Sequence, residues 1–572
     1  MAGREIALEI TAMTKNILYV LWSATFLVWL AGGKTHHLFR ATLLVSAFAL
    51  FLDFRSSRAL QESIYLKLKS AISRKWVYAY IGVAISAVIG AIVFDFEALN
   101  GTMWDLAQYI QAIFYQATQG AGHFTFATNG TNPIANYSQV HRTLSLPVLG
   151  FLYQLFEHAY VGLFWQGFFL VFPGVVAVLW YRSVMRSERL RPQPLGEILA
   201  FSGWLAIPTV LAQVLWPYTF HIAGLTCLAL AYLFYYRKNW TLWTVSLALF
   251  AFEKEEFGII SASFGLLVLT ECLFKARKRK WKENALPVLC AIVIVIVGAY
   301  SYSDFAAHSA KVIRFSDRFG HLGATPLEAL KTIFFRPMVL FQTLNRPNTH
   351  YYVFYFLTAG LVWYSRRWST FKYFIPVLPL FLANILAVEG PMQLLKDHYA
   401  LPLAVGVLAM VVFGVFAEAL RSGHGQIARA HWILSFGCLF SLCWSHQSPF
   451  RSLKESYQLF RSRLAEREAI HFLTKDPGAV VCCEERLCSR LADREYLLEA
   501  RFCREGTQFL SKALDKPVYY LVYNDGDFER RTKTAKTNAG LPYVAPPLKW
   551  KAVTPYLKVS DSMRVTPSTS LN

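Results

Sequence analysis

Long apolar stretches recur along most of this chain, and they constrain its fold more than any other feature. Many of them approach the about 20 residues that a helix needs to cross a bilayer. Of the 572 residues, 55% are hydrophobic and 16% are charged, whereas about a quarter would be charged in a soluble protein. The stretches are too long for barrel strands and lack their alternation. The sequence therefore predicts an all-α polytopic membrane protein.

The positive charge of the chain is concentrated in short loops between apolar stretches. Lysine and arginine number 57 against 36 acidic residues, giving a net charge of +21. A typical cluster is the loop 275–280, Lys-Ala-Arg-Lys-Arg-Lys. This is the positive-inside pattern, which sets orientation and favours contact with anionic membrane lipids. We therefore expect membrane lipids and no nucleic acid among the partners of the chain.

The hydropathy and charge rules predict about thirteen transmembrane helices in a domain covering residues 1–446. The segment 144–156 is short and contains Pro147, so we interpret it as re-entrant or interfacial. Counting it as a span instead would move the arginines at 182–191 to the outer side. The predicted spans are 16–32, 38–54, 76–94, 160–181, 196–215, 219–236, 240–253, 257–274, 286–302, 351–365, 373–388, 400–417 and 431–446.

The polar loops fall on one side of the membrane when the N-terminus lies inside. The outer loops are then 95–143, 216–220, 303–349 and 389–399, and the tail after 446 also lies outside. Within the first of these loops, residues 102–115 have helical periodicity with interspersed aromatic side chains. That pattern is typical of a helix lying in the plane of the interface.

The tail differs from the rest of the chain in its higher charge and shorter apolar runs. Residues 479–481 and 518–522 have the pattern of buried strands, which predicts a small extracytoplasmic α/β domain over 447–527. The remainder, 528–572, is expected to be extended or disordered. The tail also holds four cysteines without the paired spacing of a zinc site, so one or two disulfides are expected there in preference to metal: Cys482, Cys483, Cys488 and Cys503.

Asp105 is a candidate general base on the predicted interfacial helix. Gln108 and Gln111 follow at helical spacings, so Asp105 and Gln108 share a face. A carboxylate held at the membrane surface can take the proton of an acceptor hydroxyl. The alternative is a solvated loop aspartate or a helix cap, because acids are ordinary in polar loops.

Further polar groups stand at the margins of apolar stretches on the same outer side. Lys254, Glu255 and Glu256 lie where two such stretches meet, and His221 and His398 each open one. A lysine between acids can neutralise a phosphate, and histidine can donate to phosphate oxygens or carry a proton. The alternatives are a plain polar turn and structural histidines. Ionisable groups are costly beside lipid, which favours a functional site.

The order of these residues resembles a bacterial family of predicted multi-pass membrane proteins that is grouped with the GT-C glycosyltransferases. The segment 104–111 is similar to the family's Asp-Leu-x-x-x-Asp-Gln region, although Ile110 replaces its second acid and so weakens a two-acid metal site. The remaining matches follow in the family's order: His141 with Ser145 and Pro147, Phe220-His221, Lys254-Glu255-Glu256, and His398-Tyr399.

The resemblance implies a GT-C fold and transfer of a sugar from a polyprenyl-phosphate-linked donor to a glycan, lipid or protein acceptor. Asp105 would then be the catalytic base in the first outer loop. The resemblance also implies a bacterial inner membrane, with the active site and the tail facing the periplasm. No cofactor is indicated with certainty, and a divalent metal is left open. Substrate binding would involve Gln108, Gln111, His141, His221, Lys254, Glu255, Glu256, His398 and Tyr399.

Two other classes of protein remain as alternatives. Charged residues near helix ends also mark the substrate path of a transporter or lipid flippase. The chain lacks an inverted repeat, however, and its polar clusters lie at one margin and not at the midplane. The third class is a non-catalytic membrane scaffold whose outer tail binds partners.

Overall fold

The computed structural model describes residues 58–98, 104–124, 135–136, 143–214, 219, 221–276, 284–308, 318–359, 368–388, 392, 398–421, 427–443 and short pieces between 454 and 564. The first two predicted spans, 16–32 and 38–54, lie outside the described residues. So do His141 and the side chain of Asp105.

The described part of the chain before residue 450 is almost entirely helical. Its helices are α3 Arg58–Ala71, α4 Arg74–Glu97, α5 Trp104–Gln119, α7 Ser145–Phe156, α8 Tyr160–Ser187, α9 Pro194–Leu205, α10 Pro208–Val214, α11 Ile222–Arg237, α12 Trp240–Ala251, α13 Glu255–Ala276, α14 Ala285–His308, α16 Pro326–Phe335, α17 Pro337–Leu344, α18 Pro347–Ala359, α19 Trp368–Phe371, η2 Ile375–Val377, α20 Leu378–Leu386, η4 His398–Ala400, α21 Leu401–Ala409, the π-helix η5 Met410–Phe416, α22 Ala417–Arg421 and α23 Ile427–Cys443.

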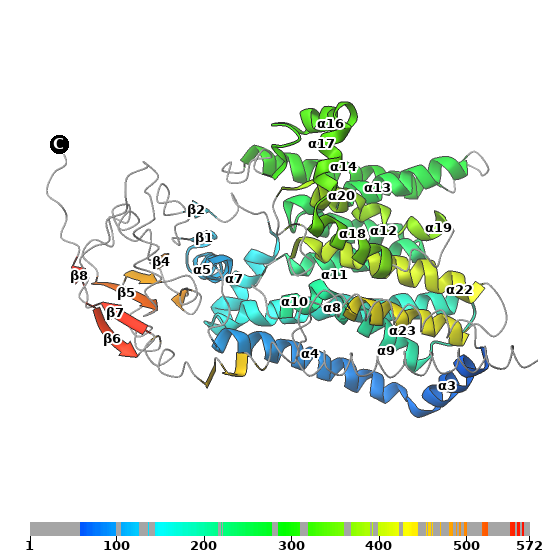
Figure 1. Cartoon of the computed structure of the whole chain (residues 1–572), viewed down its shortest axis with the longest axis horizontal. Helices are drawn as coiled ribbons and strands as arrows, with labels where there is room; N and C mark the ends of the chain where they lie inside the picture. Colours follow the sequence, from blue (N-terminus) through cyan, green and yellow to red (C-terminus); the bar gives the residue numbers. More distant parts are fainter. Residues whose placement is uncertain are drawn as a thin grey trace, which may run out of the picture.

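Five of the described helical segments are long and apolar enough to cross a membrane. They are α4, α8, α13, α14 and the continuous stretch 398–421. A sixth span results if α9 and α10, which meet at an angle of 71°, are counted together. These helices run along the long axis of the molecule, with α3 at one end and the strands of the tail at the other (Figure 1).

Several predicted spans correspond to shorter helices. α11 has 16 residues and α12 has 12, so they measure about 24 and 18 Å at the rise of an α-helix, less than the about 30 Å of a hydrocarbon core. α7 also has 12 residues, as expected for a segment that is not a simple span. The total of thirteen spans is not confirmed, because hydropathy records the apolar length of a segment but not the turns that divide it.

Large aromatic side chains fill the centre of the helical part. Trp180 of α8, Trp204 of α9 and Trp243 of α12 are fully buried. The indole of Trp180 donates to the carbonyl of Ala229 at 2.9 Å, and that of Trp204 donates to the carbonyl of Leu170 at 2.6 Å. These bonds connect α8 to α11 and to α9 and satisfy the indole donors of Trp180 and Trp204 within the core.

The tail contains a sheet whose strand order is β4-β3-β5-β7-β6, with β8 pairing against β5. Its two predicted strands are confirmed as β3 and β5, which pair in parallel. Strands also occur within 528–572, where the sequence predicts extended or disordered chain; two of them pair with β5. The strands are β3 Val480–Cys483, β4 Leu497–Glu499, β5 Pro517–Tyr523, β6 Trp550–Thr554, β7 Leu557–Ser560 and β8 Met563–Arg564, and the first outer loop adds β1 His123–Phe124 and β2 Ala135–Asn136.

Cysteines of the tail form disulfides, as predicted. Cys483 pairs with Cys488, and Cys482 is also disulfide-bonded. The tail contacts the end of α4 as well. Ser456 donates to the buried carboxylate of Asp95 at 2.7 Å, and Tyr457 stacks on Phe94. The sheet itself is attached through Val481 and Cys483 of its strand 480–483, which share an apolar cluster with residues of α5 in the first outer loop.

Candidate functional site: a polar pocket at three helix starts

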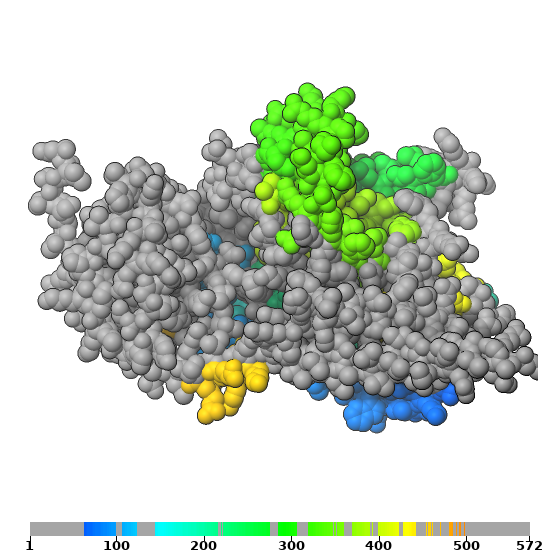
Figure 2. All heavy atoms as spheres, viewed as in Figure 1, coloured from blue at the N-terminus to red at the C-terminus, as the bar shows by residue number. Residues whose placement is uncertain are grey.

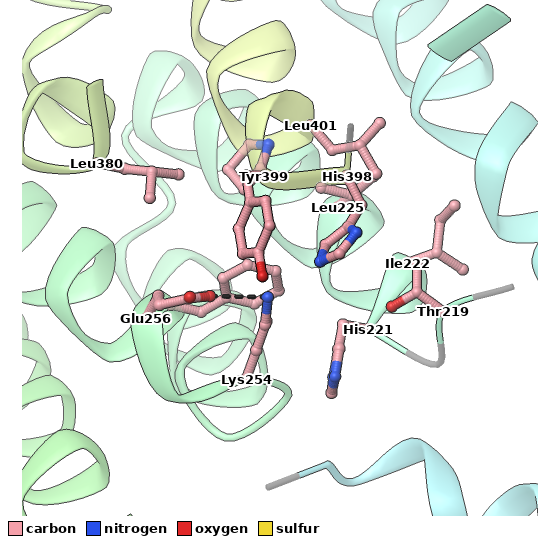
Figure 3. A pocket seen from close by; sticks show the side chains of 12 residues that line it. Thr219, His221, Ile222, Leu225, Lys254, Glu256, Leu380, His398, Tyr399 and Leu401 are labelled. Atoms are coloured by element: carbon pink, nitrogen blue, oxygen red, sulfur yellow. Dashed lines mark ion pairs between the residues drawn. The ribbon is translucent and has the colours of Figure 1, made fainter. Parts of the chain in front are cut away.

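Three helical segments begin at the same place. His221 is the N-cap residue of α11, Lys254 directly precedes α13, and His398 opens η4 and the long stretch that follows it. All three line one pocket, together with Glu256 and Tyr399 (Figure 3). The N-terminal ends of helices carry partial positive charge and unpaired N–H groups, which favour anions.

The basic ends of the same helices lie away from the pocket. Arg237 is in the last turn of α11, and Arg421 ends the stretch that begins at His398. Sixteen residues separate His221 from Arg237, about 24 Å along a helix. The pocket and the basic helix ends therefore face opposite sides of the bundle.

Lys254 is the central cation of the pocket. It is 4% exposed, and its Nζ lies 2.8 Å from Oε2 of Glu256 and 5.0 Å from the centre of the Tyr399 ring. Burial lowers the pKa of Lys254, but the carboxylates of Glu256 and Glu255 outweigh it and hold the pKa above its ordinary value. Lys254 is therefore charged at neutral pH, and its charge points into the pocket.

Arg318 supplies a second cation beside the first. Its Nη1 lies 3.4 Å from Oε1 of Glu256, and its Nη2 donates to the hydroxyl of Tyr399 at 3.3 Å. Its guanidinium carbon is 5.3 Å from the centre of the Tyr399 ring. One carboxylate and one aromatic ring thus hold two cations close together, an arrangement suited to an anionic group with several oxygens.

Glu253 joins the pocket to the first outer loop. Its buried carboxylate accepts hydrogen bonds from Ser145 at the start of α7 and, at 3.1 Å, from Thr143. Its carbonyl oxygen accepts the Nδ1–H of His221 at 2.6 Å. Because a carbonyl oxygen only accepts, that bond places a ring proton of His221 on Nδ1. Burial raises the pKa of Glu253 to about 7.

His398 and Tyr399 form the opposite wall. Their rings lie 4.2 Å apart, and the carbonyl of Tyr399 accepts a hydrogen bond from the amide of Asn384 at 3.2 Å. The pocket is partly open and has a volume of about 20 Å³, close to the room that one water needs. A larger ligand would therefore lie across the mouth of the pocket and place only a small anionic group against Lys254.

The helix that carries Asp105 packs against α7. Leu106 and Ile110 of α5 share an apolar cluster with Leu146 and Leu149 of α7. Since Ser145 begins α7 and bonds Glu253, a continuous chain of contacts runs from α5 to the turn that carries Lys254.

The structure thus brings together five predicted site residues: His221, Lys254, Glu256, His398 and Tyr399. Glu255 starts α13 beside them. Gln108 and Gln111 are buried in α5 and are not part of the pocket lining, so their role in binding stays a prediction. Among the described residues no group of three or more His, Cys, Asp or Glu side chains is placed to hold a metal ion.

Arg318 and Glu253 are site residues that the sequence did not single out. Arg318 lies in the outer loop 303–349, which holds six lysine and arginine residues, so its position in the sequence does not distinguish it from the others. Glu253 extends the charged run at 254–256, but no sequence pattern shows that its side chain turns toward Ser145 and away from the pocket.

The helices and the pocket define a polytopic helical membrane protein with a charged site at one end of its bundle. The chain belongs to the family of predicted membrane proteins called DUF2079, whose model matches residues 95–538. This confirms the family resemblance. The comparison with curated proteins gave no match.

One solved structure with an overall similarity is that of ArnT from Cupriavidus metallidurans bound to undecaprenyl phosphate. The TM-score is 0.47 and the sequence identity 13%, and the match covers 87% of this chain and 99% of ArnT.

Proposed function

We propose that this chain is an integral membrane glycosyltransferase of GT-C type. It would transfer a sugar from a polyprenyl-phosphate-linked donor to an acceptor on the outer face of a bacterial inner membrane. The observation that carries the proposal is the pair of cations, Lys254 and Arg318, held against Tyr399 where three helices begin. A phosphate group and its charge fit such a place.

The pocket residues have distinct roles in this proposal. Lys254, Arg318 and His398 stabilise the negative charge that develops on the phosphate as the sugar leaves. Glu256 orients both cations, and His221 is held at the rim by its bond to Glu253. Asp105 takes the proton of the acceptor hydroxyl, and its helix is connected to the pocket through α7 and Glu253.

The size of the pocket supports a lipid-linked donor in preference to a transported solute. The pocket has a volume of about 20 Å³, which suits a small anionic group, so the sugar and the lipid chain would stay at its open side. A transporter needs an enclosed substrate site near the midplane. The pocket instead lies where helices begin, at one margin of the bundle.

The proposal is tested by transfer from a panel of undecaprenyl-phosphate-linked sugars that carry tritium in the sugar. The protein would be reconstituted in vesicles together with acceptor lipids and glycans. We expect label to leave the undecaprenyl lipid with the parent protein. Asp105→Asn should bind the same donor but lose about a hundredfold to ten-thousandfold in rate, because an amide cannot take the proton. Movement of intact labelled lipid across the bilayer would instead favour a lipid flippase. If neither sugar transfer nor lipid movement occurs, the result would favour a non-catalytic scaffold.

A further inference from the structure

The hairpin formed by α16 and α17 exposes an unusual amount of apolar surface. Leu327 is 64% exposed, Phe334 77%, Phe335 82%, Met338 66% and Phe341 63%. Isolated exposed apolar side chains are ordinary, but a contiguous set of large ones marks an interaction surface.

The hairpin is a preformed element of structure. Thr325 accepts a hydrogen bond from the backbone N–H of Glu328, and Glu328 in turn accepts one from the N–H of Ala324. Pro326 and Pro337 occupy the first positions of the two helices, where proline is best tolerated. The apolar side chains are therefore presented by two helices, the first of them capped, and not by an irregular loop.

The two ends of the segment that carries the hairpin are attached to the same place. At one end the carbonyl of Arg318 accepts the N–H of Val388 at 2.8 Å. At the other, Nη1 of Arg346 donates to the carbonyl of Ala387 at 3.1 Å. Both ends of the segment 318–346 are thus held at residues 387–388, just after α20, and Arg318, which contacts Glu256 and Tyr399 of the pocket, stands at its base.

The hairpin projects sideways from the bundle. In Figure 1 it lies beyond α14, level with the length of the spanning helices and not past their ends. Figure 2 shows the same segment as a protrusion from the surface. Side chains at this level face the bilayer, and a surface directed at a soluble partner would extend past the helix ends.

We propose that α16 and α17 form a lipid-inserted hairpin whose apolar side chains occupy the outer leaflet of an anionic bilayer. Lys331 and Arg336 are exposed on the same hairpin, where they can contact acidic headgroups. The only carboxylate of the two helices, Glu328, is used in the helix cap. An amphipathic helix with this distribution lies in the interface with its apolar face among the acyl chains.

Insertion of the hairpin would also fix how deep the pocket lies in the membrane. Because Arg318 begins the same segment and contacts Glu256 and Tyr399, insertion of the hairpin holds the pocket beside the headgroup layer. The lipid surface proposed here does not depend on sugar transfer, and its test is independent of any enzymatic activity.

The test uses fluorophores attached to single introduced cysteines in the full chain. Phe334→Cys and Met338→Cys would be labelled with bimane and reconstituted in vesicles that contain phosphatidylglycerol. The matched control is Gln458→Cys, an exposed position in the segment after α23. Parent protein treated in the same way gives the background from native cysteines. Two quenchers are compared: lipid with a nitroxide on the acyl chain close to the headgroup, and aqueous iodide.

Lipid insertion predicts that the nitroxide quenches the labels at 334 and 338 several times more strongly than the label at 458, with iodide giving the reverse order. Quenching of 334 and 338 by iodide would place the hairpin in water and overturn the proposal. Quenching by neither agent would show that protein covers the face, for example a second copy of the chain, and would also overturn it.

Discussion

At the scale of single residues, the four consecutive ionisable residues 253–256 have side chains that point in different directions. Glu253 turns toward Ser145 and Thr143, Lys254 points into the pocket, and Glu256 pairs with Lys254. In a turn exposed to water, these four side chains would be solvated. Here they are directed to different partners, which explains how a turn between apolar helices can keep so much charge.

The buried carboxylate of Glu253 predicts a dependence of stability on pH. Its pKa is raised from 4.5 to about 7 because burial disfavours the charged form. The folded protein therefore keeps a proton that the unfolded chain releases, so stability is highest below about pH 4.5 and falls as pH rises toward 7. The full change is of order 3 kcal/mol at about 1.4 kcal/mol per pKa unit.

Thermal melting in detergent between pH 5 and pH 8 measures this contribution. We expect the melting temperature of Glu253→Gln to fall less with rising pH than that of the parent, because the amide is neutral at every pH. At pH 8 the variant should melt at a higher temperature than the parent. Glu62→Gln removes an exposed carboxylate of α3 and should keep the parent's slope. Equal slopes for parent and Glu253→Gln would show that Glu253 is ionised throughout.

The sequence identified most of the polar residues that line the pocket, but not their geometry. Histidines and lysine at the ends of apolar stretches are visible because they are rare beside lipid. The approach of Arg318 to Tyr399 is a contact across 81 residues, and no local pattern encodes it. The burial of Gln111 in α5 likewise depends on α7, which packs against that helix through a separate set of apolar side chains.

At the scale of elements, α13 and α14 approach each other closely because small residues line their contact. A Cβ on Gly258 would lie 2.6 Å from the carbonyl oxygen of Gly298, and one on Gly265 would lie 2.9 Å from that of Ala291. Without side chains at these points the backbones approach directly, as is common between helices in membranes. The turn that carries Lys254 immediately precedes α13, so this packing supports the pocket.

Adding one methyl group at this contact should loosen the pair. Gly298→Ala places a Cβ 2.8 Å from the backbone nitrogen of Ala262, so the helices must separate, at a cost of about 1–3 kcal/mol. Gly82→Ala is the matched control, because a Cβ at Gly82 of α4 meets nothing within 4 Å. The melting temperature should fall by several degrees for Gly298→Ala and stay unchanged for Gly82→Ala. Equal melting of the two variants would mean that the contact is not tight.

Element types were predictable, and element ends less so. The periodicity over 102–115 predicted a helix that the structure has as α5, Trp104–Gln119. Apolar length predicted spans at 219–236 and 240–253, whereas the helices there are shorter, since His221 and Glu253 bond across the turns and terminate them. Strands β6, β7 and β8 were missed because they are short and stabilised mainly by pairing with one another or with β5.

At the scale of the whole molecule, the pocket and the basic helix ends occupy opposite sides of the bundle. The positive-inside rule then predicts that the pocket and the tail face outward. The disulfides of the tail agree with an oxidising compartment.

Labelling of introduced cysteines in intact cells checks this orientation. A membrane-impermeant maleimide should react with Lys516→Cys in the tail without permeabilisation. Lys280→Cys, in the basic loop after α13, is the control and should react only after the membrane is opened. The opposite order would invert the topology and move the pocket to the cytoplasmic side.

The most direct test of the central claim is binding of undecaprenyl phosphate to the purified protein. Lys372 offers a matched control for Lys254: its Nζ lies 3.1 Å from Glu271 and 5.2 Å from the ring centre of Tyr235, in the last turns of α11. We predict that Lys254→Ala weakens binding about tenfold to a hundredfold, because it removes a charge-assisted hydrogen bond to the phosphate. Lys372→Ala should leave the binding unchanged. Equal losses in the two variants, or no binding by the parent protein, would contradict a polyprenyl-phosphate site at this pocket.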